Sequence, residues 1–203
     1  MIHTNKELPS LITLDRLSYI INHIGSFCKD VKGDVCEVGV YKGGSLTRIA
    51  PLFKNKKVFG IDTFEGLPEP SEWDNVNNLK EFRGHKKGAF GDVDFKELQE
   101  YFKKNYKNVV LIKCLFPNGV IKKMFKNRTF CFVHVDVDFY QSVKDCCKFF
   151  CPKLAIDGII MFDDYNFSST PGAKKAVDEY FENKDNYLIR KLPTKQFFAV
   201  KMR

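Results

Sequence analysis

The sequence lacks several patterns that would place the protein in familiar classes. None of its seven cysteines forms a Cys-x-x-Cys pair, which argues against a zinc site. No apolar run approaches the roughly 20 residues that cross a membrane, and the first seven residues hold no apolar signal core. We therefore expect no membrane contact, no export, and reduced thiols in a cytoplasmic protein.

Positive charge is in excess, but it is not concentrated anywhere. The 203 residues carry a net charge of +8, and the lysines are scattered in small groups rather than gathered in one dense stripe. A basic balance suits nucleic acid, a membrane surface or an anionic small molecule. The scattering favours a solvated surface, and an anionic small-molecule partner is the alternative.

Hydrophobic periodicity predicts strands that alternate with helices. Apolar runs predict strands at 35–39, 58–62, 109–114, 130–140, 156–164, 187–192 and 197–202. Apolar residues at helical spacing predict helices at 13–30, 46–53 (with Ser45 as a candidate cap), 95–106, 117–125, 142–151 and 173–181. This pattern predicts an α/β fold with a mostly parallel seven-stranded sheet that ends in an antiparallel hairpin.

We expect one domain over residues 1–203, with two distinctive segments. Residues 1–32 hold an amphipathic helix that packs either on the body of the domain or on a partner subunit, which would build a homo-oligomer. Residues 64–92 are too long and too polar for an ordinary connection, and we expect a lid or substrate loop. Trp73, the only tryptophan, lies in this loop either as a lid residue or as a hydrophobic anchor.

A glycine-rich stretch from Glu37 to Ser45 follows the first predicted strand. Glycines such as Gly39 let a ligand approach the backbone, and the next helix offers free N–H groups at its start. Glu37 would repel a phosphate, so it points instead to an ammonium group, such as the amino group of an amino-acid-like cofactor. Asp62 ends the second strand, where an acid can accept hydrogen bonds from both hydroxyls of a ribose. A helix-capping role is the alternative for Asp62.

Acidic residues gather at the ends of the fourth and fifth predicted strands. Asp136 and Asp138 alternate with apolar residues, and together with His134 they should point to one face of a strand. Asp163 and Asp164 end the next strand. Four carboxylates at neighbouring strand ends need a cation, and their oxygens suit Mg²⁺ or another divalent ion. Independent helix caps are the alternative, and His134 is interpreted as a strand histidine rather than a base.

Four motifs follow one another along the chain: Cys36-Glu-Val-Gly-Val-Tyr-Lys-Gly-Gly-Ser45, Gly60-Ile-Asp-Thr-Phe-Glu-Gly-Leu-Pro68, Val133-His-Val-Asp-Val-Asp-Phe-Tyr-Gln-Ser142 and Asp157-Gly-Ile-Ile-Met-Phe-Asp-Asp-Tyr165. Together they resemble the macrocin O-methyltransferase family, and Pro171-Gly-Ala-Lys-Lys-Ala-Val-Asp178 continues the match. The resemblance covers nearly the whole chain from about Gly33 onward. It implies a Rossmann-like class I methyltransferase fold with helices on both faces of the sheet, and the use of S-adenosyl-L-methionine and Mg²⁺ on sugar hydroxyls of natural products.

The resemblance also implies roles for the matching residues. The residues that would contact the cofactor are Glu37, Gly39, Val40, Tyr41, Ser45, Asp62, Thr63, Phe64 and Asp136. Within that set Asp62 would hold the ribose, with Thr63 and Phe64 near the adenine. The metal would be bound by Asp136, Asp163 and Asp164. Asp136 would also be the catalytic residue that takes the proton of the acceptor hydroxyl. Asp138 would lie next to the metal ligands without binding the metal itself.

The expected function is a divalent-metal-dependent O-methyltransferase that acts on a hydroxyl of a sugar or glycosylated small molecule. A nucleic-acid methyltransferase would use the charge of +8, but its usual Asn/Asp-Pro-Pro-aromatic run is absent. A nicotinamide-dependent oxidoreductase would share Asp62, but it needs Gly-x-Gly-x-x-Gly where this chain has Glu37-x-Gly39. A methyltransferase for another small molecule and a non-catalytic cofactor-binding module stay open, and the sequence does not name the acceptor.

Overall fold

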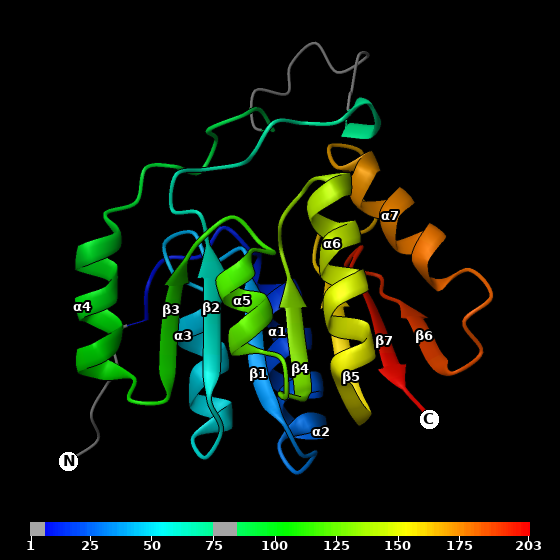
Figure 1. Ribbon diagram of the computed structural model, residues 1–203, viewed down its shortest axis with the longest axis horizontal. Helices are drawn as coiled ribbons and strands as arrows, with labels where there is room; N and C mark the ends of the chain where they lie inside the picture. Colours follow the sequence, from blue (N-terminus) through cyan, green and yellow to red (C-terminus); the bar gives the residue numbers. More distant parts are fainter. Residues whose placement is uncertain (1–6, 75–84) are drawn as a thin grey trace.

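The computed structural model describes residues 7–74 and 85–203, and its centre is a seven-stranded sheet (Figure 1). The strands in chain order are β1 (Asp34–Val38), β2 (Val58–Asp62), β3 (Val109–Lys113), β4 (Phe130–Val135), β5 (Leu154–Phe162), β6 (Tyr187–Lys191) and β7 (Phe197–Lys201). Their order across the sheet is β3-β2-β1-β4-β5-β7-β6. The first five strands run parallel, and β7 pairs antiparallel with both β5 and β6. The predicted fold class, including the hairpin at the end of the chain, is confirmed.

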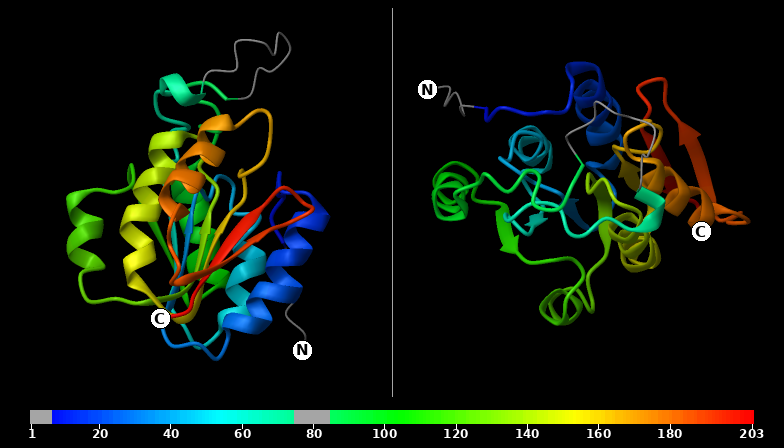
Figure 2. Two further views of the ribbon diagram at one scale, coloured as in Figure 1. Left: turned by 90° about the vertical axis from the view of Figure 1, so that its right-hand side faces the viewer. Right: turned by 90° about the horizontal axis from the view of Figure 1, so that it is seen from above.

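Helices cover both faces of the sheet (Figure 2). One face carries α1 (Leu14–Ser18), η1 (Tyr19–Gly25), α2 (Ser26–Cys28), α3 (Leu46–Ile49), η2 (Ala50–Phe53) and α4 (Phe95–Asn105). The other face carries α5 (Gly119–Met124), α6 (Tyr140–Phe150), η4 (Cys151–Lys153) and α7 (Pro171–Phe181). A short helix, η3 (Glu72–Asp74), lies in the long connection after β2.

Strand side chains alternate between two hydrophobic cores, because neighbouring residues of a strand point to opposite faces of the sheet. In β1, Val35 packs on the side of α1 to α4, whereas Cys36 and Val38 pack on the side of α5 to α7. In β5, Ile159 and Ile160 divide in the same way. Burial on both faces explains the near-continuous apolar runs that the sequence shows at these strands.

The predicted N-terminal helix packs on the body of the protein. It runs without a break from Leu14 to Cys28, and its middle part, η1, is π-helical. Leu17, Ile20 and Ile24 are buried in the core beneath it. Of the two packing alternatives, contact with the body is therefore the one observed, while the homo-oligomer stays a prediction. Among the described residues, none of the helices has the length and apolar character that would let it cross a bilayer.

Two predicted helix starts differ from the structure. Ser45 has helical backbone angles and makes no capping hydrogen bond, so the expected cap on α3 is wrong. Helix α5 begins at Gly119 rather than at Pro117, because the side chain of Asn118 accepts a hydrogen bond from the N–H of Ile121 at 2.9 Å. An asparagine cap satisfies one of the free N–H groups at a helix start, which a proline cannot do.

Asp74 ties the connection after β2 to the start of helix α6. The buried carboxylate accepts the N–H of Tyr140 at 2.7 Å through Oδ1. Its Oδ2 accepts the N–H and the hydroxyl of Ser71 at 2.8 and 2.6 Å. A carboxylate at this end of a helix is favoured by the helix dipole, so Asp74 caps α6 from a distant segment. Residues 75–84 of the predicted lid lie outside the described residues.

Replacing Asp74 with alanine should lower the free energy of unfolding by about 1–2 kcal/mol, which is the usual cost of losing a capping side chain. Urea denaturation followed by circular dichroism measures this change. Glu72→Ala, two residues earlier on an exposed side chain, is the matched control and should change the same quantity by less than about 0.5 kcal/mol. Equal effects of the two substitutions would show that Asp74 does not hold the connection.

Candidate functional site

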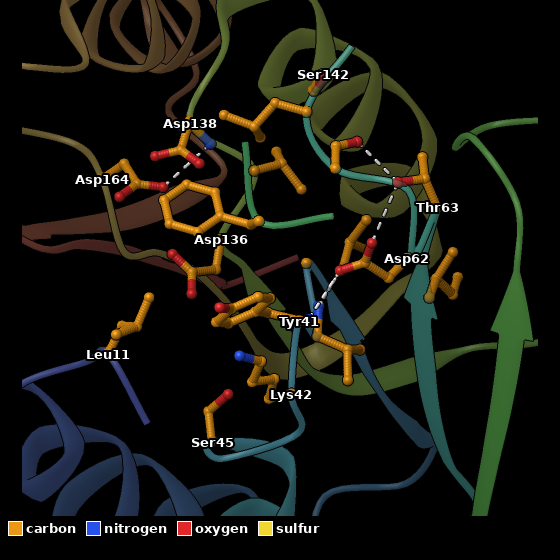
Figure 3. A pocket seen from close by; sticks show the side chains of 18 of the residues that line it. Leu11, Tyr41, Lys42, Ser45, Asp62, Thr63, Asp136, Asp138, Ser142 and Asp164 are labelled. Carbon is orange, nitrogen blue, oxygen red and sulfur yellow. Dashed lines mark hydrogen bonds between the residues drawn. The ribbon is translucent and has the colours of Figure 1, made fainter. Parts of the chain in front are cut away.

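A cavity lies at the carboxyl ends of β1, β2 and β4, the edge at which open α/β sheets bind ligands (Figure 3). The predicted site residues that line it are Gly39, Val40, Tyr41, Ser45, Asp62, Thr63 and Asp136, together with Asp138 and Asp164. Asp62 and Thr63 lie on one side of the cavity, and the three aspartates of the later strands lie on the other. Glu37, Phe64 and Asp163 are not part of the lining.

Gly39 brings the loop of residues 39–45 after β1, called the glycine loop below, into direct contact with the acidic loop after β4. Its φ of +93° belongs to the region that favours glycine, and a Cβ at this position would stand 1.8 Å from the carbonyl oxygen of Asp136. Any side chain would therefore push the two loops apart. The glycine loop and Asp136 consequently form one continuous wall of the cavity.

Asp62 holds the same loop from the opposite side. Its Oδ2 accepts the N–H groups of Val40 and Tyr41, each at 2.8 Å, and its Oδ1 accepts the N–H of Phe64 at 2.8 Å. The capping alternative is not observed, because residues 63–71, which follow Asp62, are not helical. The hydroxyl of Thr63 lies 3.4 Å from Oδ1 as well. Since a carboxylate has about four acceptor positions, Asp62 has at most one left for a ligand in the cavity.

Asp92 links the glycine loop to the far end of the 64–92 connection. Its carboxylate accepts the hydroxyl of Tyr41 at 2.8 Å and the ammonium of Lys42 at 2.5 Å. The bonds from Lys42 and Tyr41 lower the pKa of Asp92. The ring of Phe90 packs edge-on against Tyr41, with the ring centres 5.5 Å apart. The far end of the predicted lid is therefore attached to the glycine loop.

Glu37 lies beneath the cavity and is paired with His134. Both side chains are completely buried, they stand opposite each other in the register of β1 and β4, and Oε1 of Glu37 lies 2.8 Å from Nδ1 of His134. Burial acts to lower the pKa of His134, but the nearby carboxylates of Asp163 and Glu37 outweigh it and raise this pKa to about 10. Oε2 of Glu37 and Nε2 of His134 have no hydrogen-bond partner among the described residues.

Two aromatic residues, Phe64 and Trp73, lie in the connection after β2 and outside the cavity lining. Phe64 is buried, and its ring packs on that of Phe95 with the centres 4.7 Å apart. Trp73 is half-exposed outside the cavity lining, with the ammonium of Lys175 4.3 Å above its ring. Of the two alternatives for Trp73, the structure favours the anchor of the connection.

The acidic residues belong to the loops that follow β4 and β5, not to the strands themselves. Strand β4 ends at Val135 and β5 at Phe162, each immediately before the first aspartate of the loop that follows, and Asp138 adopts a φ of +57°. The expectation that His134, Asp136 and Asp138 share one strand face is therefore wrong. Because β4 and β5 are neighbours in the sheet, the two loops still meet. Asp136, Asp163 and Asp164 each offer an oxygen, and these oxygens lie within 4.8 Å of one another.

This group of three carboxylates, the acid cluster, fits a divalent cation. Burial and the negative charges of Asp163 and Asp164 raise the pKa of Asp136, and burial and the charges of Asp138 and Asp163 raise the pKa of Asp164. A cation would relieve this repulsion. Opposite ligands of Mg²⁺ stand about 4 Å apart, so small side-chain rotations bring the three oxygens around one ion.

Two basic residues at the cluster were missed by the sequence reasoning. Arg16 of α1 donates a hydrogen bond to Oδ2 of Asp163, and His85 of the long connection places Nε2 2.9 Å from Oδ1 of Asp138. Both residues line the cavity. Neither lies in a motif, because each reaches the site from a segment remote in sequence. Their only signal in the sequence was the excess of acidic groups at the neighbouring strand ends.

Comparisons with known proteins bear on this site. The chain is 27% identical over 161 residues to demethyldecarbamoylnovobiocin O-methyltransferase of Streptomyces niveus, a match that covers 74% of this chain and 59% of that protein. It is 24% identical to the 8-demethyl-8-(2,3-dimethoxy-alpha-L-rhamnosyl)-tetracenomycin-C 4'-O-methyltransferase of Streptomyces olivaceus, covering 85% of this chain and 66% of that one. The chain thus spans about three fifths to two thirds of the length of these relatives.

The crystal structure of CalS11, a calicheamicin methyltransferase, has the same fold. It superposes with a TM-score of 0.75 at 22% identity, over 92% of this chain and 78% of CalS11. The sequence profile described as Macrocin-O-methyltransferase (TylF) matches residues 10–191. This profile covers most of the chain, including the glycine loop, Asp62 and the acid cluster. The chain therefore belongs to the macrocin O-methyltransferase family.

Proposed function

We propose that this protein transfers the methyl group of S-adenosyl-L-methionine to a hydroxyl group of a sugar or of a glycosylated small molecule, with the help of a divalent cation. The observation that carries this proposal is the cavity whose lining brings the glycine loop and Asp62 together with Asp136 and Asp164 of the acid cluster. The glycine loop and Asp62 supply groups for an adenosyl and amino-acid ligand. The acid cluster supplies hard oxygen donors for a cation beside an acceptor.

The residues of the cavity divide the work of the reaction. The glycine loop and Asp62 hold the donor, and Asp136, Asp163 and Asp164 hold the cation. A bound divalent cation supplies a Lewis acid that lowers the pKa of a neighbouring hydroxyl. Asp136 receives the hydroxyl proton, the acceptor oxygen forms a bond to the methyl carbon, and the broken carbon–sulfur bond leaves its electron pair on sulfur. Most of the rate gain comes from positioning and from fixed charge.

The relatives guide the choice of acceptor. The name of the Streptomyces olivaceus protein specifies a methylated rhamnosyl group as the site of reaction. We therefore propose a deoxysugar, carried either by a nucleotide or by a natural-product aglycone. Transfer of labelled methyl groups to a panel of nucleotide-linked sugars and neutral glycosides separates an anionic acceptor from a neutral one. Absence of transfer to every member, with the donor bound, would contradict the sugar acceptor and leave a methyltransferase for another small molecule or a cofactor-binding module.

Donor binding can be tested without knowing the acceptor. At 100 times its dissociation constant, S-adenosylhomocysteine should stabilise the protein by about 2.7 kcal/mol. For a chain of this size the melting temperature should then rise by roughly 5–10 °C. Asp62→Ala should lose most of this rise, because the substitution removes both the proposed ribose contact and the anchor of the glycine loop.

Asp30→Ala is the matched control for this shift, because Asp30 is exposed and remote from the cavity lining. It should keep the wild-type shift. For each variant, the rise in melting temperature is measured against the same variant without ligand. A lower stability of unliganded Asp62→Ala therefore does not affect the comparison. A wild-type rise in melting temperature in Asp62→Ala would show that Asp62 does not contribute to donor binding.

A further inference from the structure

Arg16 enters the acid cluster from the N-terminal helix. Its guanidinium donates to Oδ2 of Asp163, and its charge stands 5.0 Å above the ring of Phe167. The side chain of Arg16 is 14% exposed and that of Asp163 is completely buried, so the pair is largely removed from water. Arg16 also lines the cavity, as do Asp136 and Asp164.

Asp163 has few remaining positions for a third partner. Its Oδ1 accepts the side-chain amide of Gln196 at 2.6 Å and lies 3.7 Å from Nε2 of His134. Its Oδ2 is the oxygen that Arg16 binds. A divalent ion that uses Asp163 therefore meets a fixed positive charge on the same carboxylate. The guanidinium of Arg16 and a divalent ion, bound to one carboxylate with little water between them, repel each other strongly.

The same contact has a favourable side in the absence of metal. Asp163 would otherwise be a buried carboxylate beside two others, and an uncompensated buried charge is costly. Arg16 supplies a positive charge at this point. When no metal is present, Arg16 therefore provides the positive charge that the metal would provide.

We propose that Arg16 is a built-in competitor of the divalent cation for Asp163, and that it sets how tightly the acid cluster binds metal. This inference rests on the metal site of the proposed function. In the metal-free protein Arg16 neutralises Asp163. In the metal-bound protein the two cations share or exchange this carboxylate, and their repulsion lowers the affinity for metal.

The test measures metal binding directly. Free Mn²⁺ is titrated by electron paramagnetic resonance in the full-length protein, with no donor, acceptor or turnover involved. Arg16→Gln removes the positive charge and keeps a side chain that can hydrogen-bond to Asp163. We expect its dissociation constant for Mn²⁺ to be at least tenfold lower than that of the wild type. Arg16→Lys, which keeps the charge, should bind Mn²⁺ within about threefold of the wild type.

Arg48→Gln is the matched control for loosening of the N-terminal segment. Arg48 holds that segment by donating to the carbonyl oxygen of Leu8 at 2.9 Å and by pairing with Glu7 at 3.0 Å. It is not part of the cavity lining. Its loss should free the segment but leave Mn²⁺ affinity unchanged. An increase in Mn²⁺ affinity in Arg48→Gln equal to that in Arg16→Gln would overturn the proposed competition. It would indicate instead that the N-terminal segment limits the access of the metal to the site.

The outcomes separate this proposal from the one on which it rests. Unchanged or weaker Mn²⁺ binding in Arg16→Gln, with clear binding to the wild type, overturns the competition and leaves the metal site in place. No binding to the wild type or to any Arg16 variant overturns the metal site, and the competition with it. Circular dichroism of each variant confirms that the fold is intact before the titration. If Arg16→Gln does not fold, Arg16→Met provides the uncharged member of the series.

Discussion

Replacing Asp136 with alanine is expected to lower the rate of methyl transfer by at least a thousandfold. Asp136 offers an oxygen to the acid cluster and lies in the wall that joins the glycine loop to that cluster. The substitution removes one cation ligand and the proposed proton acceptor together. Loss of a general base alone typically costs about 10²–10⁴ in rate, and loss of a ligand adds to it.

Binding of S-adenosylhomocysteine to the same variant should remain measurable, since most proposed donor contacts come from the glycine loop and Asp62. Labelled-methyl assays and isothermal titration calorimetry measure the two quantities separately. Asp185→Ala is the control, because Asp185 is exposed and contacts only the chain end at Arg203 among its described ion pairs. Retained turnover in Asp136→Ala, and retained turnover of the wild type in EDTA, would both refute the metal role.

Replacing His134 with leucine is expected to lower the free energy of unfolding by about 3–5 kcal/mol, the usual cost of breaking a buried ion pair from one side. His134 and Glu37 are completely buried, and Nδ1 of His134 lies 2.8 Å from Oε1 of Glu37. Leucine has a similar volume, so packing changes little while the carboxylate of Glu37 loses its cation. Urea denaturation without any ligand measures the loss.

The double variant Glu37→Met/His134→Leu provides the control for this reasoning. Removing both charges leaves no buried ion without a partner, so most of the stability should return. The difference between the double variant and His134→Leu isolates the charge effect from the packing effect. A loss below about 1 kcal/mol in His134→Leu would mean that the two groups do not form an ion pair.

Local sequence patterns predicted the sheet and the meeting of the acids, because both depend on short-range signals. Alternating apolar runs and helical spacing are properties of neighbouring residues, and acids after two strands of a parallel sheet necessarily reach the same edge. The pattern therefore grouped four acids at neighbouring strand ends, and the family resemblance selected Asp136, Asp163 and Asp164 among them, the three whose oxygens lie within 4.8 Å of one another. The strand ends were less certain, because the apolar residues after Val135 continue the alternation into the loop.

The partners of Glu37 and Asp163 could not be predicted in this way. Glu37 meets His134 only because β1 lies beside β4, a pairing between segments 97 residues apart. Arg16 meets Asp163 across 147 residues. Such contacts depend on how helices and strands are placed in three dimensions, so a single sequence contains no local signal for them. The ammonium-binding role for Glu37 stays a prediction, with a histidine already occupying one of its oxygens.

The central claim is that one divalent ion sits among Asp136, Asp163 and Asp164 beside the donor. Crystals grown with Mn²⁺ and S-adenosylhomocysteine test it most directly, because the anomalous signal locates the metal. We expect a single strong peak within roughly 2.0–2.4 Å of an oxygen from each of the three aspartates, next to the sulfur of the donor product. Density for the donor product with no peak at these carboxylates would contradict the account.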